Sequence, residues 1–437
     1  MNDGQLEEKT DLTAEATAKI SQSESLASSA GGLGPAIDLL MSLEKQCRVG
    51  NDLENLKRAV TKAVVLCKEA GDYEKLIETL NFVNKRRSQK NGAITAIVKE
   101  AMTYIDSSPS PELKKDLVVC LRDITDGKIY IEAERASLTM TLAMMLEAAG
   151  EVNEAADTLQ EVHVETFGSL SKKEKVEFIL EQTRLVLAKK DFVRAYIVSQ
   201  KINKKVFAEE GFAELKIRFY TLMGEYFRTQ KDAFSLCDCY HEIYNTPVVK
   251  ADEAQMKAAL EATVLFLVLS PYSPEQQDML HRLSADDATS QIESLKKTLK
   301  LFTTNEIIAF PFPEQHELLA LPVAAEGGAD LLAHWKEMMH TRVVQHNIRV
   351  AAAYYKRIQG KRLASLLGLS SDELEKQVSN MVSEGDIYAK IDRPADIIRF
   401  AKPKTADEVL GDWSSDIHTL LNLVEDTTHA INKEMMV

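Results

Sequence analysis

The sequence predicts a fold dominated by α-helices: an α-solenoid of TPR- or HEAT-like helical hairpins, then a winged helix with a small β-hairpin, then a long C-terminal helix. The chain has only 18 glycines and 11 prolines among 437 residues, whereas an average protein has roughly 12% of the two together. The stretch from Glu112 to Thr246 contains no proline at all. The clear alternation of apolar and polar residues that is typical of strands lies between residues 387 and 400.

The first segment, residues 1–34, is expected to be a disordered acidic tail. It contains six acidic residues, two lysines and no aromatic residue. Such a segment buries too little apolar surface to offset the entropy lost on ordering. Gly31, Gly32 and Pro35 mark the boundary with a helical-repeat arm, which is expected over residues 35–228.

Repeats in the arm are indicated by a recurring turn that ends in an acidic residue. Glu151, Asp191 and Asp232 open amphipathic segments at intervals of 40 and 41 residues, and Asp72 lies 79 residues before Glu151. An acidic residue at this position caps free N–H groups and suits the helix dipole. A period near 40 residues fits two helices and two turns, which is the unit of an α-solenoid.

Residues 229–402 are expected to form a further domain, with a helical part over 229–340 and a winged helix over 341–402. Prolines and paired glycines between residues 301 and 330 predict an irregular connection inside the helical part. Ser370 and Glu373 form a capping box that opens a third winged-helix segment, and Gly385 ends it. Two apolar stretches around the turn 393–396 then predict a β-hairpin.

Residues 403–437 are expected to form one helix with a heptad-like apolar seam. Burial of its six large side chains contributes roughly 10–15 kcal/mol as an upper estimate, and an exposed seam promotes association. The seam therefore packs either within this chain or in a helical bundle made by several chains, and we favour the bundle. The seam residues are Leu410, Trp413, Ile417, Leu420, Val424 and Ile431.

Catalytic and ligand-binding motifs are not found, so the chain is not expected to be an enzyme or to hold a cofactor or a metal. HExxH, P-loop and nucleophile-elbow patterns are missing. His334, His340 and His346 are six residues apart and do not share a helix face. The predicted third winged-helix segment, residues 372–384, carries four acidic residues against Lys376. That charge disfavours approach to DNA phosphates.

The cysteines and the hydropathy pattern indicate in which cellular compartment the protein is expected. Five cysteines form no disulfide or metal pattern, which is typical of reduced thiols in a cytoplasmic or nuclear protein. The longest apolar run, residues 262–269, is far short of the ~20 residues that span a bilayer. No signal peptide and no membrane contact are expected.

The predicted order of a helical-repeat array, a winged helix and a terminal helix is accompanied by several distinctive stretches. They are KRRSQ (85–89), DGKIYIEAERASLT (126–139), VETFGSLSKKEKVEFILEQ (164–182), RVVQHNIRVAAAYYKRI (342–358), IYAKIDRP (387–394) and GDWSSDI (411–417). The order of elements resembles the PCI family, whose members occur in the proteasome, the signalosome and a translation initiation factor. The stretches are most similar to the proteasome-lid branch of that family.

The resemblance implies a non-catalytic scaffold of the lid that supports ubiquitin-dependent protein degradation. Its implied partners are other PCI subunits of the lid and a metalloprotease-type deubiquitinase, in a hetero-oligomer without nucleic acid. The alternatives are a subunit of a sister complex of the signalosome type and, less favoured, a nucleic-acid-binding winged helix. Beside the bundle helix, the resemblance implies a contact at the winged-helix edge through Ile387, Tyr388, Ile391, Ile397 and Phe400.

Overall fold

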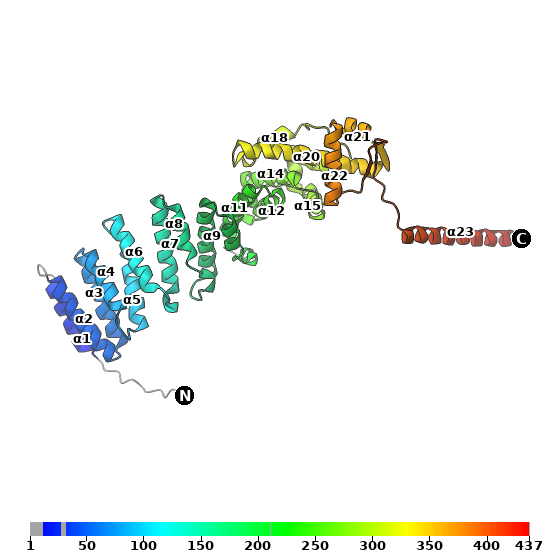
Figure 1. Cartoon of the computed structure of the whole chain (residues 1–437). Helices are drawn as coiled ribbons and strands as arrows, with labels where there is room; N and C mark the ends of the chain where they lie inside the picture. The colour runs from blue at the N-terminus through cyan, green and yellow to red at the C-terminus, as the bar shows by residue number, and fades with distance from the viewer. Residues whose placement is uncertain (1–11, 28–31, 210, 437) are drawn as a thin grey trace. The chain divides into compact units, whose positions relative to one another are not determined.

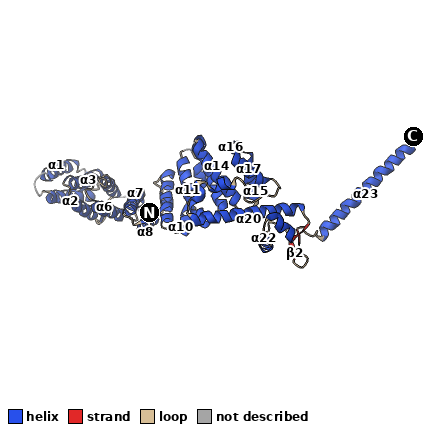
Figure 2. Ribbon diagram, turned by 90° about the horizontal axis from the view of Figure 1, so that it is seen from above, coloured by secondary structure: helices blue, strands red, loops and turns tan. Residues whose placement is uncertain are grey.

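The computed structural model describes residues 12–27, 32–209 and 211–436. The chain divides into two compact units, residues 1–226 and 227–437. Both are built mainly from helices (Figures 1 and 2), and in the described part of the chain the strands lie in the winged helix alone. This architecture confirms the predicted class of fold.

The first unit is a stack of helices in which neighbours in sequence pack together, such as α2 with α3, α7 with α8, and α9 with α10 (Figure 1). Short 3₁₀ turns at 129–131, 164–166 and 204–208 connect some of them. The helices are α1 (Thr13–Ala27), α2 (Leu33–Val49), α3 (Leu53–Glu69), α4 (Tyr73–Asn84), α5 (Asn91–Met102), α6 (Pro111–Thr125), α7 (Glu132–Ala148), α8 (Val152–Gln160), α9 (Lys172–Ala188), α10 (Phe192–Ser199) and α11 (Ala213–Gln230), the last of which crosses into the second unit.

A recurring turn joins many of these helices. A residue with positive φ ends one helix, and an acidic residue starts the next. The acidic residue's N–H donates to the carbonyl five residues earlier, as from Asp191 to Val186 (3.1 Å), which is the hydrogen bond of a Schellman motif. The pairs are Asn51-Asp52, Gly71-Asp72, Gly150-Glu151, Lys190-Asp191 and Lys231-Asp232.

The predicted acidic caps are confirmed at three of the four positions. The carboxylates of Asp72, Asp191 and Asp232 each accept a backbone N–H from the first turn of the following helix, at 3.0–3.3 Å. The backbone hydrogen bond from Lys75 is the main cause that lowers the pKa of Asp72. Glu151 starts α8 without such a bond. Asp52 caps α3 in the same way, which the 40-residue period did not predict.

The expectation of a disordered tail is wrong for residues 13–27, which form α1. Residues 1–11 and 28–31 lie outside the described residues. Helix α1 packs against α2 and α3, with Ala16 and Ser23 buried, and the Asn55 side-chain amide donates to the Thr13 hydroxyl (3.0 Å). The prediction of disorder from composition was wrong here because alanine and serine side chains are small. They allow helices to pack closely but contribute little to the mean hydropathy of the segment.

The second unit holds a helical part and the winged helix. The short α18 and α19 confirm the irregular connection predicted between residues 301 and 330. The helices and strands of the second unit are α12 (Ala233–Tyr244), α13 (Pro247–Ala251), α14 (Glu253–Leu269), α15 (Pro274–Ala285), α16 (Asp287–Gln291), α17 (Glu293–Thr303), α18 (Gln315–Leu319), α19 (Pro322–Ala325), α20 (Ala329–Tyr354), β1 (Arg357–Gln359), α21 (Gly360–Leu367), α22 (Ser371–Glu384), β2 (Lys390–Asp392), β3 (Ile397–Arg399) and α23 (Ala406–Met435).

Helix α20 connects the two parts of this unit without interruption, so the expected boundary at residues 340–341 falls inside a helix. Near its start, Trp335 is fully buried edge-on to Phe266, with ring centroids 5.7 Å apart. Farther along, the Asn347 side chain accepts the N–H of Ile308 (2.8 Å) and donates to its carbonyl (2.9 Å). Asn347 thereby holds the irregular connection against α20.

The winged helix contains a three-stranded antiparallel sheet in the order β1-β3-β2. The hairpin β2–β3 was predicted, and so were the Ser370–Glu373 capping box and the left-handed Gly385 after α22. The strand β1 was missed. It has three residues with one inward side chain, Ile358, so no alternation is readable in the sequence.

We predict that Lys190→Gly stabilises the arm by about 0.5–1 kcal/mol. Lys190 has φ 65°, and the left-handed conformation costs a non-glycine residue about 1–2 kcal/mol, of which the greater flexibility of glycine in the unfolded chain removes a part. The measurement is the midpoint of urea-induced loss of the helical circular-dichroism signal. Lys173→Gly, inside α9, is the control and should lower the midpoint. A lower midpoint for Lys190→Gly would contradict the prediction.

Candidate interaction surfaces

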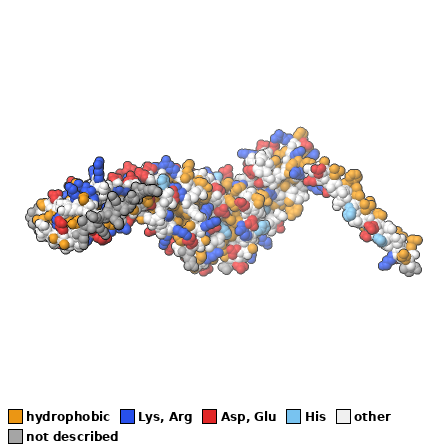
Figure 3. All heavy atoms as spheres, turned by 90° about the horizontal axis from the view of Figure 1, so that it is seen from below, with side chains coloured by type: hydrophobic (Ala, Val, Ile, Leu, Met, Phe, Trp, Pro, Cys, Tyr) orange, Lys and Arg blue, Asp and Glu red, His pale blue; other side chains and the backbone are white. Residues whose placement is uncertain are grey.

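Helix α23 exposes apolar side chains along its whole length. Of its 30 residues none is buried, and its large apolar side chains are more than two-fifths exposed, with Trp413 at 63% and Leu420 at 62%. Figure 3 shows hydrophobic side chains along this helix. The six seam residues named from the sequence all lie on α23, so the alternative of a seam packed within this chain has no support among the described residues.

The start of α23 is organised by its own residues. The Thr405 N–H donates to the Glu408 carboxylate (2.9 Å), and the Glu408 N–H donates to the Thr405 hydroxyl (3.3 Å), which is a capping box. Lys404 forms an ion pair with Asp412 in the second turn. These contacts fix where the helix begins, while its apolar side chains stay available.

The core of the winged helix decides which predicted edge residues are accessible. Phe400 is only 7% exposed and belongs to this core, so its assignment as a contact residue is wrong. Ile387 and Ile391 pack against the core and are half-buried, as is Tyr388. The core residues are Val344, Ile348, Ala351, Ile358, Leu363, Ala364, Leu374, Val378, Met381, Ile398 and Phe400.

The strand order corrects the predicted edge. Because β3 lies between β1 and β2, Ile397 is in the central strand and offers no free backbone edge. The two edge strands of the sheet are β1 and β2. On the outer face of the sheet, the register places Arg357, Arg399 and Lys390 directly across from one another, and all three are exposed.

A contact between the hairpin turn and α21 stabilises this arrangement. Asp396 has φ 52°; its carbonyl accepts the Gly360 N–H (2.9 Å) and its carboxylate accepts the Lys361 N–H (3.2 Å). A Cβ atom at Gly360 would overlap the Asp396 carboxylate. Glycine at position 360 therefore allows the turn to approach the first residue of α21.

Helix α22 is as acidic as the sequence indicates. Asp372, Glu373 and Glu384 are exposed, and Glu375 pairs with Arg393 of the hairpin turn (Nε to Oε1, 2.8 Å). This helix would have to enter the DNA groove in the usual winged-helix mode, where its charge opposes phosphate approach.

The potential metal ligands and the three histidines named from the sequence do not come together in the described chain. No group of three or more histidine, cysteine, aspartate or glutamate residues is placed to hold a metal in the described ranges. His346 is buried against Phe302, and desolvation lowers its pKa to about 4. His340 lies against Phe310 and His334 against Trp335, so the three histidines occupy separate environments.

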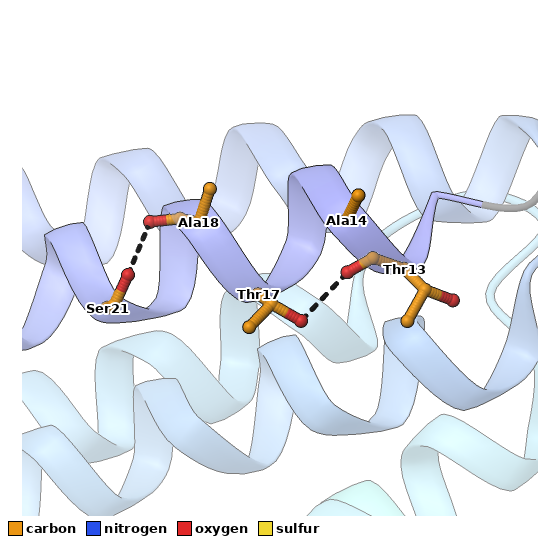
Figure 4. Close-up of a pocket in the computed structure, with 5 residues that line it drawn as sticks. All are labelled: Thr13, Ala14, Thr17, Ala18 and Ser21. Carbon is orange, nitrogen blue, oxygen red and sulfur yellow. Dashed lines mark hydrogen bonds between the residues drawn. The ribbon is translucent and has the colours of Figure 1, made fainter.

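A shallow depression on α1 is lined by small exposed residues (Figure 4). The hydroxyl groups there donate to carbonyls of their own helix, from Thr17 to Thr13 (2.8 Å) and from Ser21 to Ala18 (2.9 Å). The depression presents no charged or large apolar side chain, so we assign no site to it. In the ranges that the structure covers, no helix has the length and apolar character needed to cross a membrane.

These features define a helical-repeat protein with a PCI-type winged helix followed by a long exposed helix. Residues 35–252 match the family described as PSMD12/CSN4, N-terminal, residues 324–402 match the PCI domain, and residues 407–437 match the 26S proteasome regulatory subunit RPN5 C-terminal domain. The chain belongs to the family of the 26S proteasome non-ATPase regulatory subunit 12, as its relatives show.

Three relatives illustrate this membership. The 26S proteasome non-ATPase regulatory subunit 12 of Dictyostelium discoideum is 38% identical over 98% of this chain and 95% of its own length. The 26S proteasome regulatory subunit RPN5 of Saccharomyces cerevisiae is 37% identical over 91% of this chain and 90% of its own. The COP9 signalosome complex subunit 4 of Emericella nidulans is more distant, at 24% over 74% and 89%.

We predict that Gly360→Ala destabilises the winged helix by about 1–2 kcal/mol, because the Asp396 carboxylate must move and lose its bond to the Lys361 N–H. The measurement is hydrogen exchange of the backbone amides in α21 and β3. In an Asp396→Gly background the same change should cost less than about 0.5 kcal/mol, since the obstructing side chain is gone. Equal costs in both backgrounds would contradict the steric explanation.

We also predict that the buried cysteines do not react with Ellman's reagent in the folded chain. Burial raises the pKa of the Cys47 and Cys120 thiols to about 11, so both stay protonated at about pH 8, where an ordinary thiol is partly ionised. All five thiols should react in concentrated guanidinium chloride. Rapid reaction of the native chain would contradict the assigned burial.

Proposed function

We propose that this chain is a structural subunit of the proteasome regulatory-particle lid, where it supports ubiquitin-dependent protein degradation by holding other subunits in place. The observation that carries the proposal is α23: a 30-residue helix with an apolar seam and no buried residue. The relatives named as 26S proteasome regulatory subunits support the choice of complex. The signalosome alternative is less favoured because that relative is more distant.

The physical reason for assembly is the exposed seam. Each large apolar side chain that leaves water contributes about 1.5–3 kcal/mol, and the capping box lets α23 form before it meets its partners. Contact with further helices in a bundle buries Leu410, Trp413, Ile417, Leu420, Val424 and Ile431.

The winged helix supplies a second contact with a neighbouring PCI subunit. The edge position of β2 and the half-buried Ile387, Tyr388 and Ile391 support this assignment at the hairpin edge. Ile397 contributes through its side chain only. We propose that the assembled subunits position a separate metalloprotease-type deubiquitinase, and that the hetero-oligomer works in the cytoplasm and the nucleus.

The chain itself is proposed to be non-catalytic. Its histidines lie in separate environments, and burial raises the pKa of several cysteine thiols instead of activating them. Nucleic-acid binding through α22 is disfavoured by four acidic residues against Lys376.

We predict that deletion of residues 405–437 abolishes incorporation into the lid while the rest of the chain stays folded, because no described residue of α23 is buried by the remainder. The double substitution Trp413→Asp and Leu420→Asp should lower incorporation at least about tenfold, since each charge would enter an apolar bundle. Incorporation is measured by affinity purification of the tagged chain from cells and mass spectrometry of the co-purifying subunits.

The matched control places the same charges on the opposite face of the helix. Ser415→Asp with Asn422→Asp changes the net charge equally but leaves the seam intact, so incorporation should stay near normal. Normal co-purification of the lid with the truncated chain would overturn the proposed role of α23.

A further inference from the structure

We propose that the outer face of the winged-helix sheet binds an acidic helix of a partner chain through a cation row formed by Arg357, Arg399 and Lys390. This inference rests on the proposed assembly role and adds a surface to it. It concerns the face of the sheet, whereas the expected PCI contact uses the hairpin edge. The occupant is identified by its charge pattern.

The cation row follows from the register of the three strands. Arg357 is paired with Arg399 across β1 and β3, and Lys390 is paired with the same Arg399 across β2 and β3. The alternate residues Ile358, Ile398 and Ile391 lie toward the core. The three cations therefore stand side by side on the exposed face.

The row is unfavourable for the isolated chain. Like charges directly opposite in neighbouring strands repel each other. None of the three side chains forms an ion pair with another residue in the described ranges, although Arg393 and Lys404 nearby do. An anionic partner would relieve the repulsion and gain three charge contacts at once.

The spacing of the row matches an acidic helix. Neighbouring strands are about 4.8 Å apart, so the three cations span about 10 Å. Carboxylates three or four residues apart on one helix face are separated by about 5–6 Å. A helix lying across the strands thus sets two or three carboxylates against the row.

One observation favours an acidic protein helix over a nucleic acid. Asp392 lies in the adjacent row of the same face, paired through β3 with Ile397. A phosphate backbone that extends beyond the short row would meet this carboxylate. Such repulsion does not apply to a helix whose acidic stripe ends within the row.

Helix α23 of this chain carries such a stripe but is not the occupant. Glu408, Asp412 and Asp416 are spaced by four residues. However, Asp412 is paired with Lys404, and Glu408 accepts the Thr405 N–H. Two of its three carboxylates are thus already engaged at the start of α23.

The test is binding of a fluorescent helical peptide to the full chain, measured by anisotropy at low and at high salt. The probe is an alanine-rich peptide of about 20 residues with glutamate at every fourth position, and the control peptide has glutamine there. We expect the glutamate peptide to bind at low salt, to weaken at high salt, and to bind more tightly than the glutamine peptide.

The decisive variant is Arg399→Glu. It lowers the charge of the row from three to one, and the introduced carboxylate is set between Arg357 and Lys390, so cross-strand attraction keeps the sheet folded. Peptide binding should weaken about three- to tenfold. Arg362→Glu, an exposed position on α21, makes the same charge change away from the row and should alter binding less than about twofold. Unchanged circular dichroism confirms folding.

Three outcomes would overturn the inference: equal loss of binding in both variants, peptide binding only after removal of α23, or tight binding of a single-stranded RNA in place of the peptide. The second would make α23 the occupant, and the third would make the row a nucleic-acid surface. If the inference about the cation row fails while lid incorporation still depends on α23, the proposed function stands.

Discussion

The continuity of α20 is the constraint on which the second unit depends. A helix of 26 residues is about 39 Å long, and a kink in it needs proline, a bulge or an inserted group. Its first half holds Trp335 against Phe266 in the helical part, and its second half supplies Val344, Ile348 and Ala351 to the winged-helix core. No linker separates the two parts. The sheet, its edges and the cation row are therefore held at fixed positions relative to the helical core of this unit.

The two units differ in whether their apolar and charged side chains find partners among the described residues. In the first unit, small and apolar side chains are buried between neighbouring helices, and acidic caps satisfy free backbone groups at the turns. In the second unit, α23 keeps its apolar seam exposed and the sheet keeps three cations without ion-pair partners among the described residues. Such exposed apolar and like-charged groups are unfavourable in an isolated chain. Exposed groups of this kind beside a well-packed core indicate a subunit that assembles with other chains.

Much of this architecture was readable from the sequence because it depends on local signals. The spacing of Glu151, Asp191 and Asp232, the Ser370–Glu373 box and Gly385 each specify a turn or a cap within a few residues. Features that depend on tertiary contacts were not readable. Helix α1 is stabilised by α2 and α3, β1 by its pairing with β3, and the burial of Phe400 by the direction of the sheet. The cation row combines residues 33 and 42 positions from Arg357, and no local pattern places them together.

The recurring left-handed turns have a consequence for the order in which the chain folds. Each turn closes through a hydrogen bond that spans five residues, so helices of the first unit find their neighbours through short loops. Local contacts of this kind form quickly, and stacked repeats can grow from one end. During synthesis the arm can complete its packing while the winged helix is still being made. Helix α23 follows the winged helix within the second unit, so its apolar seam emerges from the ribosome only after the first unit and the rest of the second unit have had time to form.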